Sequence, residues 1–377
     1  MSVVRMAREG IYALARATGG MALVRRSRFR RERLLILCFH GVSLDDEHEW
    51  KPALFIRQEV LRERLRQLRD GGYSVVSLDD GVRRLRDGTL PRAAVALTFD
   101  DGTYDFYARA YPVLEEFGYP ATVYQTTRYS EVGTPVFDVF VSYLLWKGRH
   151  RTVDLSTVVP GAPAGAPAGA PAGAPVDAPV DAPVGAPAGA LDTPARRDAA
   201  FWTILRFAET HGLDEVARQH LAERLAAVLG IDFRSLVAKR IVSLMTPGEM
   251  AELAGKGIDF QLHTHRHRLF EEREAFTADL HMNRSLLEGA TGRVATHFCY
   301  PSGVYRRDAM AWLREAGVTS ATTCDPGLAA HDTPSLLLPR LVVTESLSPL
   351  TFESWASGVA ELLPRRTRLA HPEAREP

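Results

Sequence analysis

The sequence has few cysteines, no long apolar run and no excess charge of either sign. Its three cysteines, Cys38, Cys299 and Cys324, lie far apart among 377 residues, which argues against a disulfide framework and against a cysteine zinc site. Because 46 basic residues balance 46 acidic ones, no overall positive field attracts nucleic acid. No apolar run is long enough to span a bilayer. These absences favour a protein of a reducing compartment that does not bind nucleic acid.

Residues 1–33 combine short apolar stretches with arginines. The arginine run from Arg25 to Arg33 follows the apolar stretches, whereas a secretory signal carries its positive charge before a longer apolar core. The order predicts a cytoplasmic location, with the inner face of the membrane as an alternative. Two interpretations of the segment stay open. It is either a peripheral membrane contact or a helix packed on the domain, which is favoured because short amphipathic patterns are common in soluble helices.

From residue 34 to about 350, short apolar strands alternate with amphipathic helices. This order is typical of a parallel sheet, open or closed into a barrel. Thr246, Pro247 and Glu249 predict a capped helix start, and Gly289 predicts a helix end. The predicted strands cover residues 34–39, 73–78, 93–99, 121–124, 258–262, 297–300 and 318–323.

Two segments break the alternating pattern. Residues 138–245 predict an insertion within the sheet domain, and inside it residues 160–190 form a repeat of Gly, Ala and Pro. A repeat without large apolar groups cannot bury a core, so we expect it to be disordered or extended. The chain ends in residues 351–377, which predict a C-terminal helix and a polar tail.

Two polar clusters follow directly after predicted apolar strands, where an α/β barrel places its reactive groups. In the first, Asp100 and Asp101 precede Gly102, so one carboxylate can bind a metal while the other accepts a proton; alternatively, the loop only caps a helix. The second cluster contains His263 and His267. Two imidazoles and one carboxylate suit Zn²⁺ or a neighbouring divalent ion.

These clusters resemble the motifs of a known family. Ala96 to Gly102 resembles the first motif of the polysaccharide deacetylases, which include the chitin deacetylases and the nodulation-factor deacetylase. His263 to His267 matches the second motif, His-Ser/Thr-x-x-His, and His297 to Gly303 is similar to the third. Asp332 to Val343 resembles a late segment of many bacterial members. His40-Gly41 is similar to the Tyr-His-x-Val opening of the same subgroup.

The resemblance implies an α/β fold, a distorted (β/α)7-type barrel that carries the helical and low-complexity insertion. It also implies a metal held by Asp101, His263 and His267, with Asp100 as the general base. Zn²⁺ is the expected ion, and Co²⁺, Ni²⁺ or Mn²⁺ are alternatives.

The chain departs from the family pattern at two positions. Cys299 stands where many members have an Arg that orients the catalytic Asp, and the late segment lacks the usual general-acid His. Arg340 can hold Asp100, bind a substrate group or form a structural ion pair. His331 is a further candidate for the acid. The predicted supporting residues are His297 and Arg340 for catalysis, and Ser302, Tyr300 and His40 for the substrate and the oxyanion.

The sequence thus predicts a hydrolase that acts on carbon–nitrogen bonds and removes acetyl groups from N-acetylated sugars of a polysaccharide or glycan precursor. The expected partner is an N-acetylated glycan. Two alternatives stay open. The same site can hydrolyse a sugar O-acetyl ester, or the chain is a catalytically weakened glycan-binding protein, for which the missing Arg and His are the argument.

Overall fold

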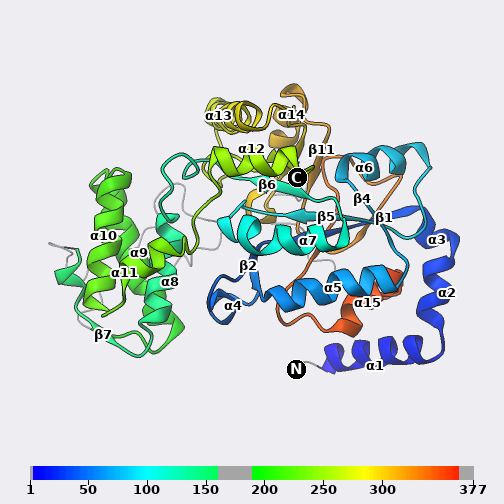
Figure 1. Ribbon diagram of the computed structural model, residues 1–377, viewed down its shortest axis with the longest axis horizontal. Coiled ribbons are helices and arrows are strands. Elements are labelled where there is room, and N and C mark those ends of the chain that lie inside the picture. Colours follow the sequence, from blue (N-terminus) through cyan, green and yellow to red (C-terminus); the bar gives the residue numbers. More distant parts are fainter. Residues whose placement is uncertain (1–2, 160–188, 365–377) are drawn as a thin grey trace, which may run out of the picture. The chain divides into compact units, whose positions relative to one another are not determined.

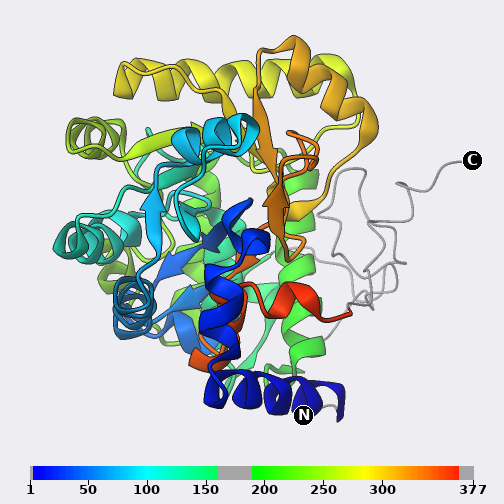
Figure 2. The same cartoon turned by 90° about the vertical axis from the view of Figure 1, so that its right-hand side faces the viewer.

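A computed structural model describes residues 3–159 and 189–364 of the chain (Figures 1 and 2). The chain forms two compact units, one with residues up to 131 and from 245 onward, the other with residues 132–244. Most of the predicted repeat, residues 160–188, lies outside the described residues, and so does the polar tail from residue 365.

The first unit is built on a sheet that has nine strands in the described residues. Seven of them follow each other in the order β11-β10-β9-β6-β5-β1-β12, while β4 pairs with β5 and β13 with β1. Only the β1–β12 pair is antiparallel. The strands are β1 Arg33–Phe39, β4 Ser74–Val76, β5 Ala94–Phe99, β6 Thr122–Gln125, β9 Asp259–Leu262, β10 His297–Cys299, β11 Ser320–Thr322, β12 Leu328–Ala330 and β13 Leu341–Val342.

The segment before β13 joins the two sides of this sheet. The backbone of Leu338 exchanges hydrogen bonds with Ala321 and Thr323 beside β11, at 2.9 Å each. Three residues later, Leu341 pairs with Leu37 of β1. The sheet therefore curls upon itself, as the barrel prediction requires, and Arg340 lies at the seam between β11 and β1.

Helices cover the curled sheet on the outside (Figures 1 and 2). The sheet is consequently buried on both faces, and every residue of β5 is buried, as expected for parallel strands between helices. A short sheet of β2 Gly41–Val42 and β3 Phe55–Ile56 lies beside the first strand. The helices are α1 Val3–Ala17, α2 Gly20–Arg26, α3 Arg28–Arg31, α4 Glu47–Trp50, α5 Gln58–Asp70, α6 Leu78–Asp87, α7 Tyr111–Phe117, α12 Pro247–Gly255, α13 Arg273–Thr291, α14 Arg307–Glu315 and α15 Pro349–Ser357.

Local sequence patterns predicted one helix start correctly and one helix end incorrectly. The predicted capping box is present, because Thr246 and Glu249 hydrogen-bond each other's backbone at the start of α12. The predicted end of α13 at Gly289 is wrong. The helix continues to Thr291 and ends at Gly292, whose φ of 67° is the left-handed conformation of a helix C-cap. No helix among the described residues combines the length and apolar character that crossing a membrane requires.

The second unit is mostly helical. It contains α8 Phe137–Lys147, α9 Pro194–Thr210, α10 Glu215–Val228 and α11 Phe233–Ala238, together with the short antiparallel pair β7 Thr152–Val153 and β8 Gly189–Ala190. Its two longest helices, α9 and α10, are separated by residues 211–214. Asp214 caps the second of the two helices by accepting the Ala217 N–H at 2.8 Å.

Candidate metal centre and catalytic carboxylate

The chain turns sharply at the end of β5, where Asp100, Asp101 and Gly102 follow. The Asp100 N–H still continues the ladder, donating to Phe39 O at 2.9 Å. Asp101 and Gly102 then adopt φ of 68° and 72°, so the chain reverses and the two carboxylates diverge. A Cβ on Gly102 would lie 1.9 Å from Gln125 Oε1. Only glycine fits both this backbone conformation and this space.

The loop after β9 carries the histidines. Thr264 and His267 have φ of 63° and 52°, a conformation that non-glycine residues keep only where the surroundings hold it. Helix α13 supplies two of those contacts. Asn283 Oδ1 accepts the His263 N–H at 3.0 Å, and Asp279 Oδ2 accepts the His265 N–H at 2.7 Å.

The sequence interpretation missed Asp279 and Asn283. Both are buried and lie four residues apart, on the same face of α13. Asn283 also donates to Gln125 O at 2.9 Å and thereby links the histidine loop to β6. Two polar residues on the apolar face of an amphipathic helix were the signal that could have revealed them.

Asp101, His263 and His267 bring three ligand atoms together. Asp101 Oδ1 lies 3.3 Å from His263 Nε2 and 3.2 Å from His267 Nε2, and the three donor atoms form one of the groups whose geometry suits a metal ion. We call these three residues the rim. The sequence prediction named all three, and the structure brings them together.

The hydrogen bonds around the rim fit a cation. His263 Nδ1 lies 2.9 Å from Cys299 O. A carbonyl oxygen only accepts, so Nδ1 carries the proton and the neutral ring turns the Nε2 lone pair toward Asp101. Asp101 Oδ1 is buried without a hydrogen-bond partner. Lone pairs on facing atoms require a positive charge between them, which a divalent ion or a proton can supply.

Electrostatics at the rim agree with this reading. Burial raises the pKa of Asp101, but the His267 and His263 imidazoles outweigh burial and hold the pKa well below its usual range. Burial lowers the pKa of His263, but the Asp101 and Asp100 carboxylates outweigh burial and raise it. The rim therefore favours an ionised carboxylate that is neutralised by a positive charge.

Asp100 has a different environment beneath the rim. Its Oδ1 accepts from Arg340 Nη1 and its Oδ2 from Arg340 Nη2, each at 2.7 Å, and both side chains are buried. Arg340 Nε also donates to Thr323 O at 2.9 Å. Burial alone would raise the pKa of Asp100, but Arg340 outweighs burial and lowers it. Among the roles left open for Arg340, the structure shows the one in which it holds Asp100.

All three cysteines of the chain gather around this pair. The Cys38 and Cys299 thiols each lie 3.4 Å from Asp100 Oδ2. Arg340 Nη2 lies 3.1 Å from Cys299 Sγ and 3.7 Å from Cys324 Sγ. All three are free thiols. We call Asp100, Arg340 and these cysteines the floor.

The three thiols of the floor differ in acidity, although burial acts on all of them in the same direction. Burial raises the pKa of Cys38 and Cys299 well above the usual range. The Cys38 hydrogen bond and Arg340 lower the pKa of Cys324 to about 6. Cys299, at the third-motif position where the resemblance led us to expect an arginine, instead lies against the Arg340 guanidinium.

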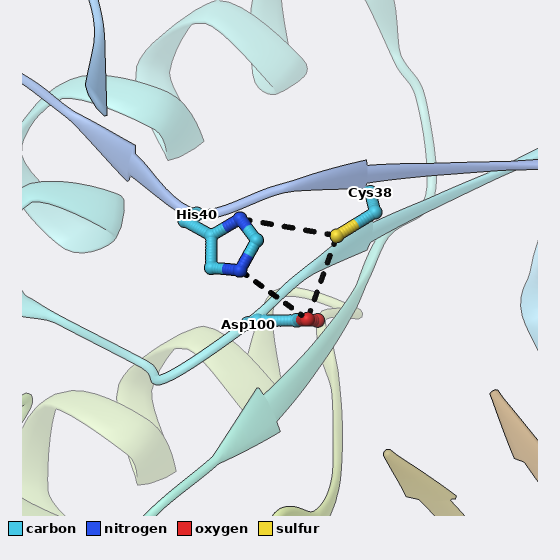
Figure 3. Close-up of side chains that lie close together, drawn as sticks. All are labelled: Cys38, His40 and Asp100. Atoms are coloured by element: carbon cyan, nitrogen blue, oxygen red, sulfur yellow. Dashed lines mark hydrogen bonds and ion pairs between the residues drawn. The ribbon is translucent and has the colours of Figure 1, made fainter. Parts of the chain in front are cut away.

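His40 links the floor to the surface. Its Nε2 lies 3.8 Å from Asp100 Oδ2 and its Nδ1 lies 3.9 Å from Cys38 Sγ (Figure 3). The side chain is 15% exposed, whereas Asp100 is 2% exposed. Cys38, His40 and Asp100 also form a candidate ligand group. Both oxygens of Asp100 are already bound to Arg340, and a cation there would face the guanidinium, so the rim is the better metal site.

The side chains of the remaining predicted residues make their contacts with other partners. His297 contacts Ser320 Oγ at 2.7 Å and Asp79 Oδ1 at 3.4 Å. Tyr300 is buried among aromatic rings beyond β10. Ser302 lies in an exposed turn with φ of 57°, and His331 is exposed after β12. Among the contacts of the described residues, none joins these four side chains to the rim or the floor.

The fold and the site define a class: an α/β protein with a curled, mostly parallel sheet and a candidate His₂Asp metal site after two of its strands. The sequence profile of the polysaccharide deacetylase family matches residues 87–142 and 196–321. The chain therefore carries a domain of this family.

Two similar proteins illustrate the match. Over 80 residues, or 21% of this chain, the sequence is 40% identical to the poly-beta-1,6-N-acetyl-D-glucosamine N-deacetylase of Escherichia coli K12. The match spans only 12% of that protein. The structure resembles the Streptococcus pyogenes deacetylase PplD in complex with acetate, with a TM-score of 0.53 and 17% identity over 85% of this chain and 96% of that one. This second likeness concerns the fold.

Proposed function

We propose that the protein is a metal-dependent deacetylase that releases acetate from N-acetylated hexosamines of a polysaccharide or glycan precursor. The observation that carries the proposal is the pairing of the rim with Asp100: three metal-ligand atoms converge, and a separate carboxylate lies directly beside them in the sequence and is held by Arg340. The polysaccharide deacetylase domain and the name of the Escherichia coli relative support the same reaction.

Asp101, His263 and His267 would hold the metal, and Zn²⁺ suits this donor set best. When bound, such an ion lowers the pKa of water and polarises a carbonyl. Asp100 accepts the proton of the attacking water. Arg340 fixes its carboxylate in one orientation through two hydrogen bonds and keeps it ionised.

The amide carbon–nitrogen bond breaks as acetate leaves, and the amine takes up a proton. His40 is the titratable ring that lies beside Asp100 and reaches solvent. We therefore assign to His40 the return of this proton, in place of the His that the late segment lacks. His297, which the sequence also offered, is bound to Ser320 and Asp79 instead.

The alternative of a catalytically weakened protein loses one of its two arguments. It rested on the arginine missing from the third motif and on the His missing from the late segment, and Arg340 supplies a guanidinium to Asp100 from a different segment. The O-acetyl esterase alternative uses the same rim and floor, so the substrate has to separate the two activities.

The test is acetate release by the full chain after chelation and after addition of Zn²⁺, Co²⁺, Ni²⁺ or Mn²⁺. The substrates are β-1,6- and β-1,4-linked N-acetylglucosamine oligomers and acetylated xylan. We expect metal-dependent acetate release from at least one N-acetylated oligomer and none from acetylated xylan. Release from acetylated xylan alone would establish the esterase, and acetate release that survives complete metal removal would overturn the proposal.

A further inference from the structure

Helix α1 turns its charged side toward the protein. Tyr12 is 3% exposed and anchors the helix. On the same side, Glu9 Oε1 accepts hydrogen bonds from Ser348 at 3.0 Å and Thr351 at 2.6 Å, and Arg16 Nε lies 3.2 Å from Glu353 Oε2. The polar contacts of α1 are therefore made with α15, with Ser348 before it and, through Arg8, with Pro364 O, while the Arg16 side chain stays 62% exposed.

The other side of α1 is apolar and exposed. Met6 is 53% exposed, Ile11 45% and Leu14 65%, and Leu23 on α2 is 74% exposed. A helix packed on a soluble domain normally buries its apolar side and exposes its charges, so α1 has the opposite orientation. In both views α1 runs along the lower edge of its unit with no other described element below it (Figures 1 and 2).

The same segment concentrates positive charge. Residues 1–33 contain nine arginines and two glutamates, an excess of seven positive charges in a chain whose net charge is zero. Arg26 is exposed and lies three residues after Leu23 on α2, so a cation and an apolar side chain share one outer face. Arg31 is exposed as well. Exposed apolar side chains beside arginines suit a partner that is both apolar and anionic.

We propose that α1 and α2 dock the protein on the surface of an anionic lipid bilayer. The apolar side chains of α1 and Leu23 enter the headgroup boundary, and the exposed Arg26 and Arg31 contact the lipid headgroups. Peripheral binding that is stable needs two such signals together, and each arginine near an anionic surface contributes roughly 1 kcal/mol. Anionic lipids rather than an acidic protein are the favoured partner, because the exposed apolar side chains lie along one outer helix face and need no matching pocket.

The experiment is co-sedimentation of the full chain with vesicles of phosphatidylcholine alone or with one-quarter phosphatidylglycerol. We expect binding at least tenfold tighter to the anionic vesicles, weakened by added salt. The double variant Leu14→Asp/Leu23→Asp should reduce binding at least tenfold. Val294→Asp is the matched control, because Val294 is 73% exposed on another part of the same unit.

A second pair of variants tests the charge. Arg26→Gln/Arg31→Gln should weaken binding to anionic vesicles by roughly 30-fold, whereas Arg314→Gln, an exposed arginine on α14, should leave it unchanged. Equal binding to both vesicle types, or equal binding of wild type and Leu14→Asp/Leu23→Asp, would overturn the proposal. So would a solution dimer that the same double variant dissociates, because the partner would then be a second copy of the chain.

Discussion

The rim and the floor of the site contain adjacent carboxylates whose negative charges are neutralised in different ways. On the floor, Arg340 neutralises Asp100 with two hydrogen bonds of 2.7 Å inside the protein. At the rim, Asp101 faces two imidazole nitrogens, and Asp101 Oδ1 has no hydrogen bond. The floor is therefore complete as the chain folds, whereas Asp101 Oδ1 and the two imidazole nitrogens at the rim need a shared positive charge, which a metal ion or a proton can supply. The floor is thus suited to fix the catalytic carboxylate of Asp100, and the rim is suited to bind a metal ion.

The largest effect is expected from breaking the floor. Arg340→Met leaves Asp100 as a buried charge without a partner, which costs about 3–5 kcal/mol of unfolding free energy. Urea denaturation of the metal-free protein measures this cost. Adding Asp100→Asn should restore most of the loss, since the uncompensated charge is then gone. A double variant no more stable than Arg340→Met would contradict the pairing.

Breaking the rim should cost metal affinity without costing the fold. The His267 side chain is 41% exposed, so His267→Ala should change the stability of metal-free protein by less than about 0.5 kcal/mol. Metal affinity should fall by more than about 100-fold. Removing a residue that only hydrogen-bonds a metal ligand already costs roughly 10–100-fold in affinity, and His267→Ala removes a ligand itself. Isothermal titration with Zn²⁺ measures the affinity. His331→Ala is the control and should bind metal as wild type does.

A smaller effect is expected from the support behind the rim. Asp279→Asn removes the charge that accepts the His265 N–H and pairs with Arg266. Metal affinity should weaken roughly 10–100-fold while Asp100 and Arg340 keep their contacts. Asp308→Asn breaks an exposed ion pair with Arg306 on α14 and serves as the matched control. Unchanged affinity in Asp279→Asn would show that α13 does not position the histidine loop.

Asp105 sharpens the comparison by pH, because it is as buried as Asp100 but has no arginine. Burial raises the pKa of Asp105 to about 7, above the roughly 3.9 of an exposed Asp. The folded state thus binds more protons, and the contribution of Asp105 to stability falls as pH rises from about 4 to 7. Wild type should lose up to about 1.4 kcal/mol per pH unit relative to Asp105→Asn in this window. Urea denaturation of both proteins at pH 5 and 7 measures this difference. An equal change of unfolding free energy with pH in wild type and Asp105→Asn would contradict the prediction.

The sequence predicted the rim because its signals are local. Asp101, His263 and His267 lie in two short motifs that follow apolar strands, and parallel strands bring their carboxyl ends to one edge. The alternation of strands and helices predicted a parallel sheet, open or closed, and the family resemblance implied that the sheet closes into a barrel. The antiparallel strand β12 was not predicted, since three residues carry too weak a pattern.

The floor could not be predicted in the same way. Cys38, Cys299, Cys324 and Arg340 are separated by up to 302 residues, and they meet only because residues 336–343 close the sheet between β11 and β1. The sequence left several roles open for Arg340 and none for the cysteines. His297 was misleading for the opposite reason: it lies in a motif, but hydrogen bonding directs its ring to Ser320 and Asp79.

The most direct test of the division between rim and floor compares Asp100→Asn with Asp101→Asn in one experiment. Metal content after gel filtration and acetate release are measured on the same preparations. Asp100→Asn should retain as much metal as wild type and lose roughly 10²–10⁴-fold in turnover, whereas Asp101→Asn should lose the metal and the turnover together. Full turnover in Asp100→Asn, or loss of metal in Asp100→Asn with retention in Asp101→Asn, would contradict the account.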